Sequence, residues 1–315
     1  MKNILVSGAH GFIGNYVVNE LLLRGYKVIA FDHHQSAAMK RGWGENVDVF
    51  LGDMRDEVAV TEAMAHADGF IHLAAVLGTQ ETISNPRPAA SSNVIGGLNF
   101  LEAAAQYNVP GVYICVGNHW MNNTYSITKT TVERFVYMFN KNRGTRVNNV
   151  RVVNAYGPKQ LAAAPYGPGK VRKITPAFIC RAICGDPVEV YGDGEQVSDM
   201  VHVSDVAKTL VNALEYADKG TVFDHPIEIG PSEHNTVRSV AELIVEIVKD
   251  MTGVESEIVF SPMRPGEIAG DSVTADNSTL ELIGMSVDDL VPLNRGMKET
   301  VKWFIENKGI TWNEC

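Results

Sequence analysis

The first half of the chain alternates short apolar runs with longer stretches in which apolar residues recur at helical spacing. Short apolar runs are typical of strands buried on both faces, and recurrence every three to four residues is typical of amphipathic helices. This alternation predicts a parallel sheet with helices on both faces, a doubly wound α/β fold. The expected strands are Ile4–Val6, Lys27–Phe31, Val47–Leu51, Phe70–Leu73, Val112–Val116 and Val147–Val153, with a later one at Ile227–Gly230.

Beyond Pro158 the regular alternation of predicted strands and helices ends. Residues 159–170 are rich in Ala, Pro and Gly, which favours a loop or lid, and the later strands and helices do not alternate regularly. We therefore expect a second, smaller α+β lobe. The predicted boundaries place residues 1–157 and about 200–230 in a Rossmann-type domain, and residues 158–199 and 231–315 in the smaller lobe.

Three glycines, Gly8, Gly11 and Gly14, separate the first strand from the first helix. A tight turn needs positive φ at Gly8, and a missing Cβ at Gly11 lets a pyrophosphate approach the backbone. Gly14 would let the helix pack close to the sheet. The N–H groups and the dipole at the helix start then favour an anion. The glycines alone fit a plain strand-turn-helix equally well.

The residues after the next two strands make the anion site more specific. Asp32 follows Gly8 by 24 positions, close to the roughly 20 expected of the acid that binds the adenosine ribose. An acid there repels a 2′-phosphate, and His33 carries little fixed positive charge, so NAD is favoured over NADP. Asp53 is placed to reach the adenine amino group. Its alternative role is a helix N-cap, for which Asp56 is also available.

Tyr125 and Lys129 stand at the start of the helix that follows the fifth strand. Residues four apart lie on one face of a helix. A lysine near a phenol favours the phenolate and lowers its pKa, so the tyrosine can act as a general base near neutral pH. A solvated pair is the alternative, and the position after a strand of a dinucleotide fold favours the functional interpretation.

The composition of the chain limits the classes of molecule that it is expected to bind. The chain has 315 residues and a formal net charge of −10 without a basic run, which argues against a nucleic-acid surface. Four cysteines lack metal-ligand spacing, and Cys180 and Cys184 fit one helix face, so we expect no metal and thiols in a reducing compartment. Without a leader or an apolar run of about 18 residues, we expect a cytoplasmic protein that does not enter membranes.

Motifs spread over nearly the whole chain occur in a characteristic order. They are Gly8-x-x-Gly11-x-x-Gly14, Asp32, Asp53, Tyr125-x-x-x-Lys129, Arg151-x-x-Asn154-x-Tyr156-Gly157-Pro158, Gly192-Asp193-Gly194-Glu195-Gln196 and Arg264-Pro265-Gly266-Glu267. Each motif alone is weak. Together they resemble the extended short-chain dehydrogenase/reductase family, in particular its nucleotide-sugar epimerase/dehydratase branch.

The resemblance implies a tightly held NAD and a nucleotide sugar, linked to UDP, dTDP or GDP, in the smaller lobe. Tyr125 would take a proton from a sugar hydroxyl, usually at C4, while the ring carbon passes a hydride to NAD. Lys129 would lower the pKa of Tyr125 and hold the nicotinamide ribose. The expected activity is C4 epimerisation by transient oxidation.

The resemblance also implies individual contacts. For the cofactor these are Gly8, Gly11, Phe12, Ile13, Gly14, Asp32, His33, Asp53, Met54, Leu73, Ala74, Ala75, Asn93, Tyr125, Lys129 and Val153. Asn154 and Arg264 would bind the substrate diphosphate, because a guanidinium fork suits phosphate oxygens. Lys170 would assist them, and Tyr191 would stack on the nucleotide base.

One departure lies at the catalytic centre. The family carries a Ser or Thr directly after the fifth strand, and this chain has Gly117 there. Thr124 is a candidate replacement, as are Asn118, His119 and a water molecule. Cys115 is a further candidate if the strand register differs by two.

Two more departures concern the substrate pocket. Seven residues separate Gly117 from Tyr125, a shorter loop than in the family, so the pocket is either more open or closed by residues 159–170. Ser198 stands where many relatives have an arginine for the phosphates. The cations available to compensate are Lys170, Arg172 and Lys173.

The short loop also lacks the adjacent Asp-Glu pair with which sugar 4,6-dehydratases eliminate water. Epimerisation therefore remains the leading prediction. Alternatives are a decarboxylase, 4,6-dehydratase or reductase of a sugar nucleotide, or an NAD-binding protein that has lost turnover. Helices near residues 89–107 and 126–142 resemble the pair that forms a homodimer in relatives. Their apolar positions, which intramolecular packing also explains in part, include Phe135, Tyr137, Met138 and Phe139.

Overall fold

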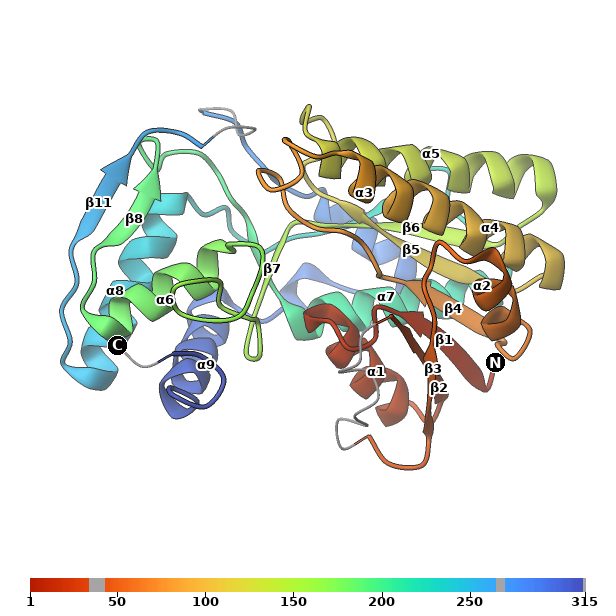
Figure 1. Ribbon diagram of the computed structural model, residues 1–315, viewed down its shortest axis with the longest axis horizontal. Helices are drawn as coiled ribbons and strands as arrows, with labels where there is room; N and C mark the ends of the chain where they lie inside the picture. The colour runs from red at the N-terminus through yellow and green to blue at the C-terminus, as the bar shows by residue number, and fades with distance from the viewer. Residues whose placement is uncertain (34–42, 265–269, 314–315) are drawn as a thin grey trace.

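The computed structural model describes residues 1–33, 43–264 and 270–313. A seven-stranded, wholly parallel sheet with the order β10-β6-β5-β4-β1-β2-β3 forms its larger part (Figure 1). The strands are β1 (Asn3–Ser7), β2 (Lys27–Asp32), β3 (Val47–Leu51), β4 (Gly69–His72), β5 (Gly111–Val116), β6 (Val147–Val152) and β10 (Ile227–Ile229). The strand order reverses between β1 and β4, so a ligand crevice is expected at their carboxyl ends.

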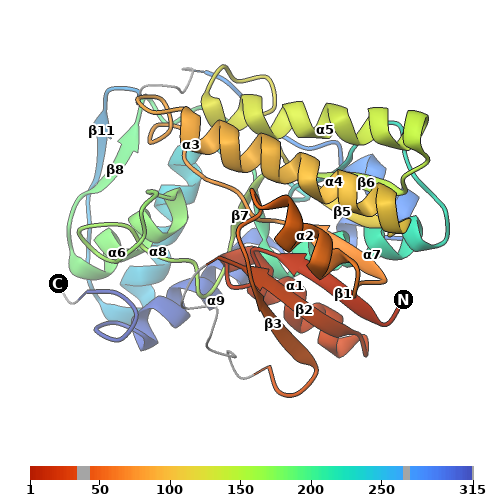
Figure 2. The same ribbon diagram turned by 45° about the vertical axis from the view of Figure 1, so that its right-hand side comes forward.

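Helices cover both faces of the sheet. On one face lie α1 (Phe12–Leu23) and α7 (Val203–Asp218), and on the other lie α2 (Glu57–Met64), α4 (Gly96–Tyr107) and α5 (Thr124–Arg143) (Figures 1 and 2). Two short helices, α3 (Arg87–Ala90) and the π-helical η2 (Ser91–Ile95), lead into α4. In β1, Ile4 and Val6 pack toward α1 and α7, whereas Leu5 packs toward α2 and α4. This alternation of buried side chains confirms the predicted doubly wound fold.

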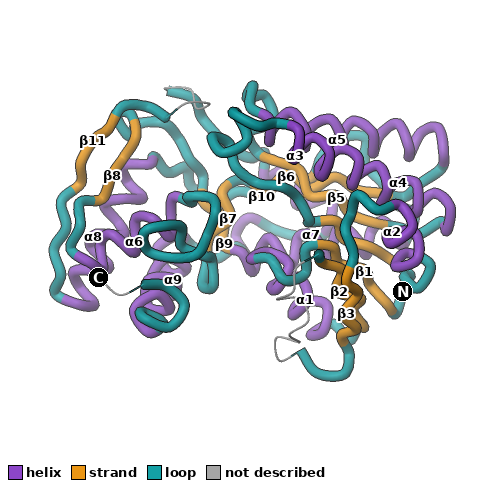
Figure 3. Tube along the Cα trace, viewed as in Figure 1, coloured by secondary structure: helices purple, strands orange, loops and turns teal. Residues whose placement is uncertain are grey.

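A second group of elements, the smaller lobe, lies beside the carboxyl ends of the strands (Figure 3). It contains the parallel pair β8 (Val188–Tyr191) and β11 (Ile258–Ser261), with α6 (Ile174–Cys184), α8 (Val237–Thr252) and α9 (Leu293–Glu306) around its own apolar core. Strands β7 (Asn154–Tyr156) and β9 (Met200–His202) pair between the two parts.

The short helices η3 (Asn277–Ile283) and η4 (Val287–Asp289) come late in the chain but lie near the large sheet. Leu280, Ile283 and Leu290 pack into the apolar core that α1 and α7 share with the sheet. The polypeptide therefore returns to the first core after it has built most of the smaller lobe. The division into two domains remains a prediction.

The cysteines only partly match the expectation of thiols. Cys115 and Cys180 are buried and free, whereas Cys184 is disulfide-bonded, which corrects the expectation for that residue. Across the described ranges, no helix is long and apolar enough to cross a membrane. Within the same ranges no group of His, Cys, Asp and Glu side chains is arranged to hold a metal ion.

Candidate active site

The turn after β1 is so tight that side chains are excluded at two of its positions. Gly8 has a φ of +69°, its N–H donates to the Phe31 carbonyl at 2.9 Å, and its carbonyl accepts from the Gly11 N–H at 3.0 Å. A Cβ would lie 2.9 Å from the Ala74 nitrogen if added to Gly8, and 2.1 Å from the Gly8 oxygen if added to Gly14. The predicted positive φ of Gly8 is confirmed. The missing Cβ of Gly14 lets α1 pack against the turn that directly follows β1, and the predicted role of Gly14 in packing the helix close to the sheet remains a prediction.

The start of α1 offers backbone donors. Gly11 is the N-cap residue and, among the described residues, no side chain caps this helix. The N–H groups of Phe12 and Ile13 therefore remain available at the positive end of the helix dipole. These groups face the carboxyl edge of the sheet, so the cradle fits the pyrophosphate that the sequence predicts there.

Asp32 lies at the end of β2 beside this cradle, with a side chain that is 12% exposed. Its carboxylate accepts hydrogen bonds from the backbone N–H groups of His10 (3.2 Å) and His33 (2.9 Å). A carboxylate has further lone pairs for a ribose hydroxyl. The His33 side chain is 71% exposed and its Nδ1 lies 3.4 Å from Asp32. Cofactor contact by either residue remains a prediction.

Asp53 and Asp56, the two acids after β3, were both candidates for the N-cap of the next helix, and the structure distinguishes them. Asp56 caps α2, accepting from Val58 N–H at 3.0 Å and Ala59 N–H at 3.3 Å. Asp53 instead forms a bidentate pair with the Arg55 guanidinium, and this hydrogen bond lowers the pKa of Asp53. The N-cap alternative for Asp53 is therefore wrong, because Asp56 occupies that position.

Met54, another predicted cofactor contact, packs against the start of α4. Its carbonyl accepts a hydrogen bond from the Asn99 side chain at 3.0 Å, and a Cβ on Gly96 would meet its side chain at 2.7 Å. This contact anchors the chain after β3 to a helix on the same side of the sheet.

Two buried polar side chains shape the loop after β4. The Ser7 hydroxyl lies 2.6 Å from His72 Nδ1 and accepts from the N–H groups of Leu73 (3.0 Å) and Ala74 (3.2 Å). Ser7 was not among the site residues predicted from the sequence. Its signal was a polar residue at the end of an apolar strand, directly before Gly8.

The Asn93 amide lies in the π-helical turn η2. It accepts from Val76 N–H at 2.7 Å and donates to the Val76 carbonyl at 3.1 Å and to the Thr128 hydroxyl at 3.0 Å. These bonds tie the loop after β4 to α5. The contact of Asn93 with the nicotinamide end of NAD remains a prediction, and the Asn93 amide holds the loop after β4.

Helix α5 carries the Tyr125–Lys129 pair and is capped by Asn123, whose Oδ1 accepts from Ser126 N–H at 2.9 Å. Lys129 is 1% exposed, and its Nζ lies 4.0 Å from the centroid of the Tyr113 ring. Burial lowers the pKa of Lys129 to about 8. Burial also raises the pKa of Tyr125 above its usual value. In the chain alone, desolvation therefore outweighs the lowering that the sequence led us to expect from Lys129.

Gly117 directly follows β5, which confirms the expected strand register. A Cβ at this position would lie 3.0 Å from Val153 Cγ1 and 3.3 Å from Val273 Cγ1. A family-type hydroxyl residue would therefore fit here only if these neighbours shifted by a few tenths of an ångström. Cys115 lies inside the strand with its Sγ 3.5 Å from Asn149 Oδ1, so the register shift that would have made it a candidate does not occur.

The other candidates for the missing hydroxyl have partners in the protein. Thr124 donates its hydroxyl proton to the Thr82 carbonyl at 3.1 Å. His119 Nδ1 lies 3.3 Å from the Gly117 carbonyl oxygen, and Asn118 Nδ2 lies 3.4 Å from Met121 Sδ. None of these contacts selects one group as the replacement, and a catalytic role for Thr124 remains a prediction.

Cationic side chains from the smaller lobe gather around Tyr191. The Arg264 guanidinium lies 4.9 Å from the centroid of the Tyr191 ring. Arg172 donates to the Tyr191 hydroxyl at 2.8 Å and to Glu189 at 3.0 Å. A base that stacks on the face of Tyr191 next to Arg264 must therefore displace this guanidinium. The rest of the Arg264 motif, residues 265–267, lies outside the described residues.

The remaining substrate candidates differ in their surroundings. Asn154 donates to the Ser198 hydroxyl at 3.0 Å and to the Asp199 carbonyl at 3.2 Å, and Lys170 is exposed. Lys173 is half-buried, and burial lowers its pKa, with the nearby Glu81 carboxylate opposing this shift and Arg264 adding to it. Both a carboxylate and a guanidinium thus act on Lys173, and compensation for Ser198 by Lys170 or Lys173 remains a prediction.

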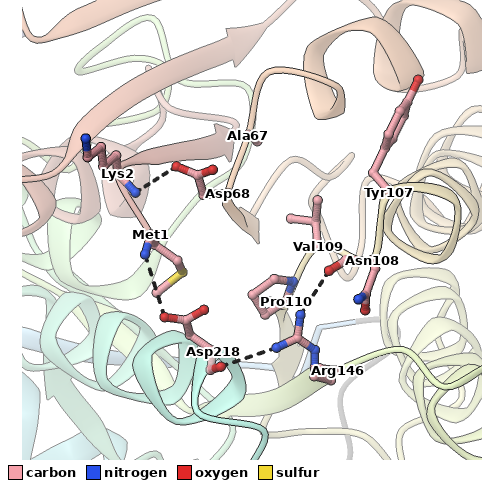
Figure 4. A pocket seen from close by; sticks show the side chains of 10 residues that line it. All are labelled: Met1, Lys2, Ala67, Asp68, Tyr107, Asn108, Val109, Pro110, Arg146 and Asp218. Carbon is pink, nitrogen blue, oxygen red and sulfur yellow. Dashed lines mark hydrogen bonds and ion pairs between the residues drawn. The ribbon is translucent and has the colours of Figure 1, made fainter.

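A shallow hollow of about 500 Å³ lies at the opposite edge of the sheet. It is lined by residues that precede strands, including Lys2, Asp68 and Pro110, and Arg146 bridges it by donating to the carbonyls of Asp218 and Asn108 (Figure 4). The glycine turn and Tyr125 lie at the carboxyl ends of the strands. This hollow is therefore separate from the candidate active site.

A doubly wound sheet with a glycine turn, an acid after β2 and a half-buried tyrosine one helical turn before a buried lysine defines an NAD-binding protein of the dehydrogenase/reductase type. The model of the NAD-dependent epimerase/dehydratase family matches residues 4–230. The chain therefore belongs to this family, whose members use NAD and act on nucleotide sugars.

Several relatives resemble the chain over nearly its full length. A UDP-glucose 4-epimerase structure from Thermotoga maritima, with UDP-glucose, has 28% identity and a TM-score of 0.83, covering 97% of this chain and 99% of that one. The UDP-glucose 4-epimerase of Thermus thermophilus, with NAD, has 26% identity and a TM-score of 0.81, covering 96% and 99%. A UDP-N-acetyl-alpha-D-glucosaminuronate decarboxylase from Bacillus cytotoxicus is 26% identical, covering 97% and 98%.

Proposed function

We propose that the protein is a nucleotide-sugar 4-epimerase. The observation that carries this proposal is the half-buried Tyr125 with the buried Lys129 at the carboxyl edge of the sheet, preceded by a loop, residues 117–124, that contains no acidic residue. An elimination needs an acid to protonate the leaving hydroxyl, whereas epimerisation needs only removal and return of a hydride and a proton. The similarity to two UDP-glucose 4-epimerases supports the same choice.

NAD, when bound, supplies the hydride acceptor and donor. Gly8, Gly11 and the N–H groups at the start of α1 would hold its pyrophosphate, and Asp32 its adenosine ribose. The group that accepts and returns the proton of the sugar hydroxyl is a side chain of the protein. Tyr125 takes it from the C4 hydroxyl and later returns it, and the Lys129 ammonium stabilises the phenolate form of Tyr125.

Arg264 and Lys173 would bind the substrate diphosphate. Arg264 presents a planar fork beside Tyr191, and Lys173 adds a second positive charge from the start of α6. Lys173 would then supply the positive charge for the phosphates that many relatives obtain from an arginine at the position of Ser198. A Lys173→Met variant should bind UDP more weakly, with Lys170→Met, an exposed cation in the same segment, as its matched control.

The direct test is a screen of UDP-, dTDP- and GDP-linked sugars with product stereochemistry read by NMR. The proposal expects NAD to co-purify and one substrate to yield its C4 epimer. Release of carbon dioxide, or a 4-keto-6-deoxy product, would instead identify a decarboxylase or a dehydratase. Bound NAD without conversion of any sugar would identify a non-catalytic NAD-binding protein.

We also propose a homodimer formed through α4 and α5, which run side by side on one face of the sheet (Figures 1 and 2). Ile95, Ile127 and Met138 are between 39% and 53% exposed in this region, and exposed apolar side chains on paired helices favour association. Phe139 is 2% exposed and packs inside the protein, so it does not contribute to this face. Sedimentation of wild type and of Met138→Glu tests the proposal, because only the variant should be monomeric.

A further inference from the structure

One hydrogen bond joins the loop after β5 to the segment that leads into η3. Trp120 Nε1 donates to Asp271 Oδ2 at 2.8 Å, and the other carboxylate oxygen of Asp271 accepts from Ser272 N–H at 3.1 Å. Trp120 precedes Tyr125 by five positions, and Asp271 follows Arg264 by seven. The bond therefore links the segment before the proposed base to the segment after the proposed phosphate ligand.

On the sheet side, Trp120 is held by its neighbours. The His119 ring packs edge-on against the indole, with centroids 5.0 Å apart and an interplanar angle of 89°. His119 Nδ1 lies 3.3 Å from the Gly117 carbonyl oxygen, and the His119 carbonyl accepts from the Thr130 hydroxyl on α5 at 3.3 Å. These contacts connect Trp120, through His119, to the end of β5 and to the helix that carries Tyr125.

On the lobe side, the same segment packs over the end of β5. Val273 Cγ1 would lie 3.3 Å from a Cβ on Gly117. The Val273 N–H donates to the Val197 carbonyl at 3.0 Å, and its carbonyl accepts from Asp199 N–H at 3.2 Å. Residues 271–273 thus fill the space beside the short loop and are themselves bonded to the chain around Ser198.

We propose that Trp120 and Asp271 are positioning residues that set the distance between Tyr125 and the substrate phosphates, and that residues 271–273 form the pocket wall that the short loop does not provide. The proposal rests on the proposed function, because it takes Tyr125 and Arg264 as the two ends of the substrate site. It assigns the wall to this segment and not to residues 159–170. A nucleotide sugar bound through its phosphates would then hold its sugar ring at a fixed distance from Tyr125.

The test compares Trp120→Phe, Asp271→Ala and Asp271→Asn on the sugar nucleotide that wild type converts. The first two variants lose the hydrogen bond. Because Trp120 is 40% exposed, water competes for this bond and its net contribution is modest. We therefore expect a fall in kcat of roughly fivefold to tenfold. The dissociation constant of UDP should stay within about twofold, because Arg264 is intact. Asp271→Asn keeps an acceptor oxygen and should retain wild-type kcat. In the double variant, Trp120→Phe with Asp271→Ala, the losses should not add.

Equal kcat values in all variants, or additive losses, would overturn the proposal while leaving the epimerase activity of wild type established. Hydrogen exchange on the ligand-free protein tests the contact even if wild type converts no sugar. Replacing Asp271 by Ala should speed exchange in residues 117–121, although these lie about 150 positions away in the sequence. Unchanged exchange there would also overturn the proposal.

Discussion

Gly8 and Ala74 approach so closely that a single added carbon on Gly8 would lie 2.9 Å from the Ala74 backbone nitrogen. The turn after β1 and the loop after β4 meet at this point, where the strand order of the sheet reverses. Ser7 bonds to the same loop through the Ala74 N–H. The candidate cofactor site is therefore organised by the contact of two backbones.

Gly8→Ala should both destabilise the protein and reduce its NAD content. The residue has a φ of +69°, and the new carbon would contact Ala74, so we expect a loss of about 2–3 kcal/mol in the free energy of unfolding. Gly25→Ala is the matched control, since Gly25 has a φ of +82° and open space around its Cβ position. It should lose only about 1 kcal/mol and keep NAD. Equal losses in urea unfolding would show that the contact with Ala74 has no effect.

Lys129 should make stability depend on pH. Burial lowers its pKa from 10.5 to about 8, so between these values the folded chain binds fewer protons than the unfolded chain, and stability rises with pH. The cost of the buried ammonium is complete below about pH 8 and absent above about pH 10.5. The stability of wild type minus that of Lys129→Met should therefore increase by roughly 3 kcal/mol across this window. If this difference in the free energy of unfolding, measured by urea titration at each pH, stays constant or decreases as the pH rises, the burial of the Lys129 charge is contradicted.

Gly117→Ser should not restore a family-type active site. Its Cβ would lie 3.0 Å from Val153 Cγ1 and 3.3 Å from Val273 Cγ1, and such overpacking costs about 1 kcal/mol or more. We expect a lower melting temperature and no gain in kcat. Adding Val273→Ala should recover part of the lost stability, because it removes the contact with Val273 and leaves those with Val153 Cγ1 and Cα. A rise in kcat at unchanged stability in Gly117→Ser alone would show that the position has room for a hydroxyl.

The sequence was sufficient for the strands and for the glycine turn because both depend on local patterns. Apolar runs and helical periodicity predicted every strand of the large sheet, and the spacing of Gly8, Gly11 and Gly14 predicted the positive φ that is observed at Gly8. The return of Leu280 and Ile283 to the first core was not predicted, because no local pattern records which of two cores a short helix will join.

Contacts between distant segments could not be predicted. Ser7, Asn93 and Trp120 each bond to a segment that the fold alone brings near, and the residues next to them in the sequence do not reveal the partner. The pKa of Tyr125 shows the same limit. Helical spacing placed Lys129 near the phenol, but the degree of burial, which decides the direction of the shift, depends on tertiary packing.

The most direct test of the account uses the sugar nucleotide that the screen identifies, labelled with deuterium at C4, in ordinary water. If Tyr125 removes the hydroxyl proton while the C4 hydride is stored and returned, the wild-type product is the C4 epimer with its deuterium retained. Tyr125→Phe should bind NAD but convert the substrate at least roughly a hundredfold more slowly. A product that has exchanged its C4 deuterium with water, or a Tyr125→Phe variant with full activity, would contradict the proposed mechanism.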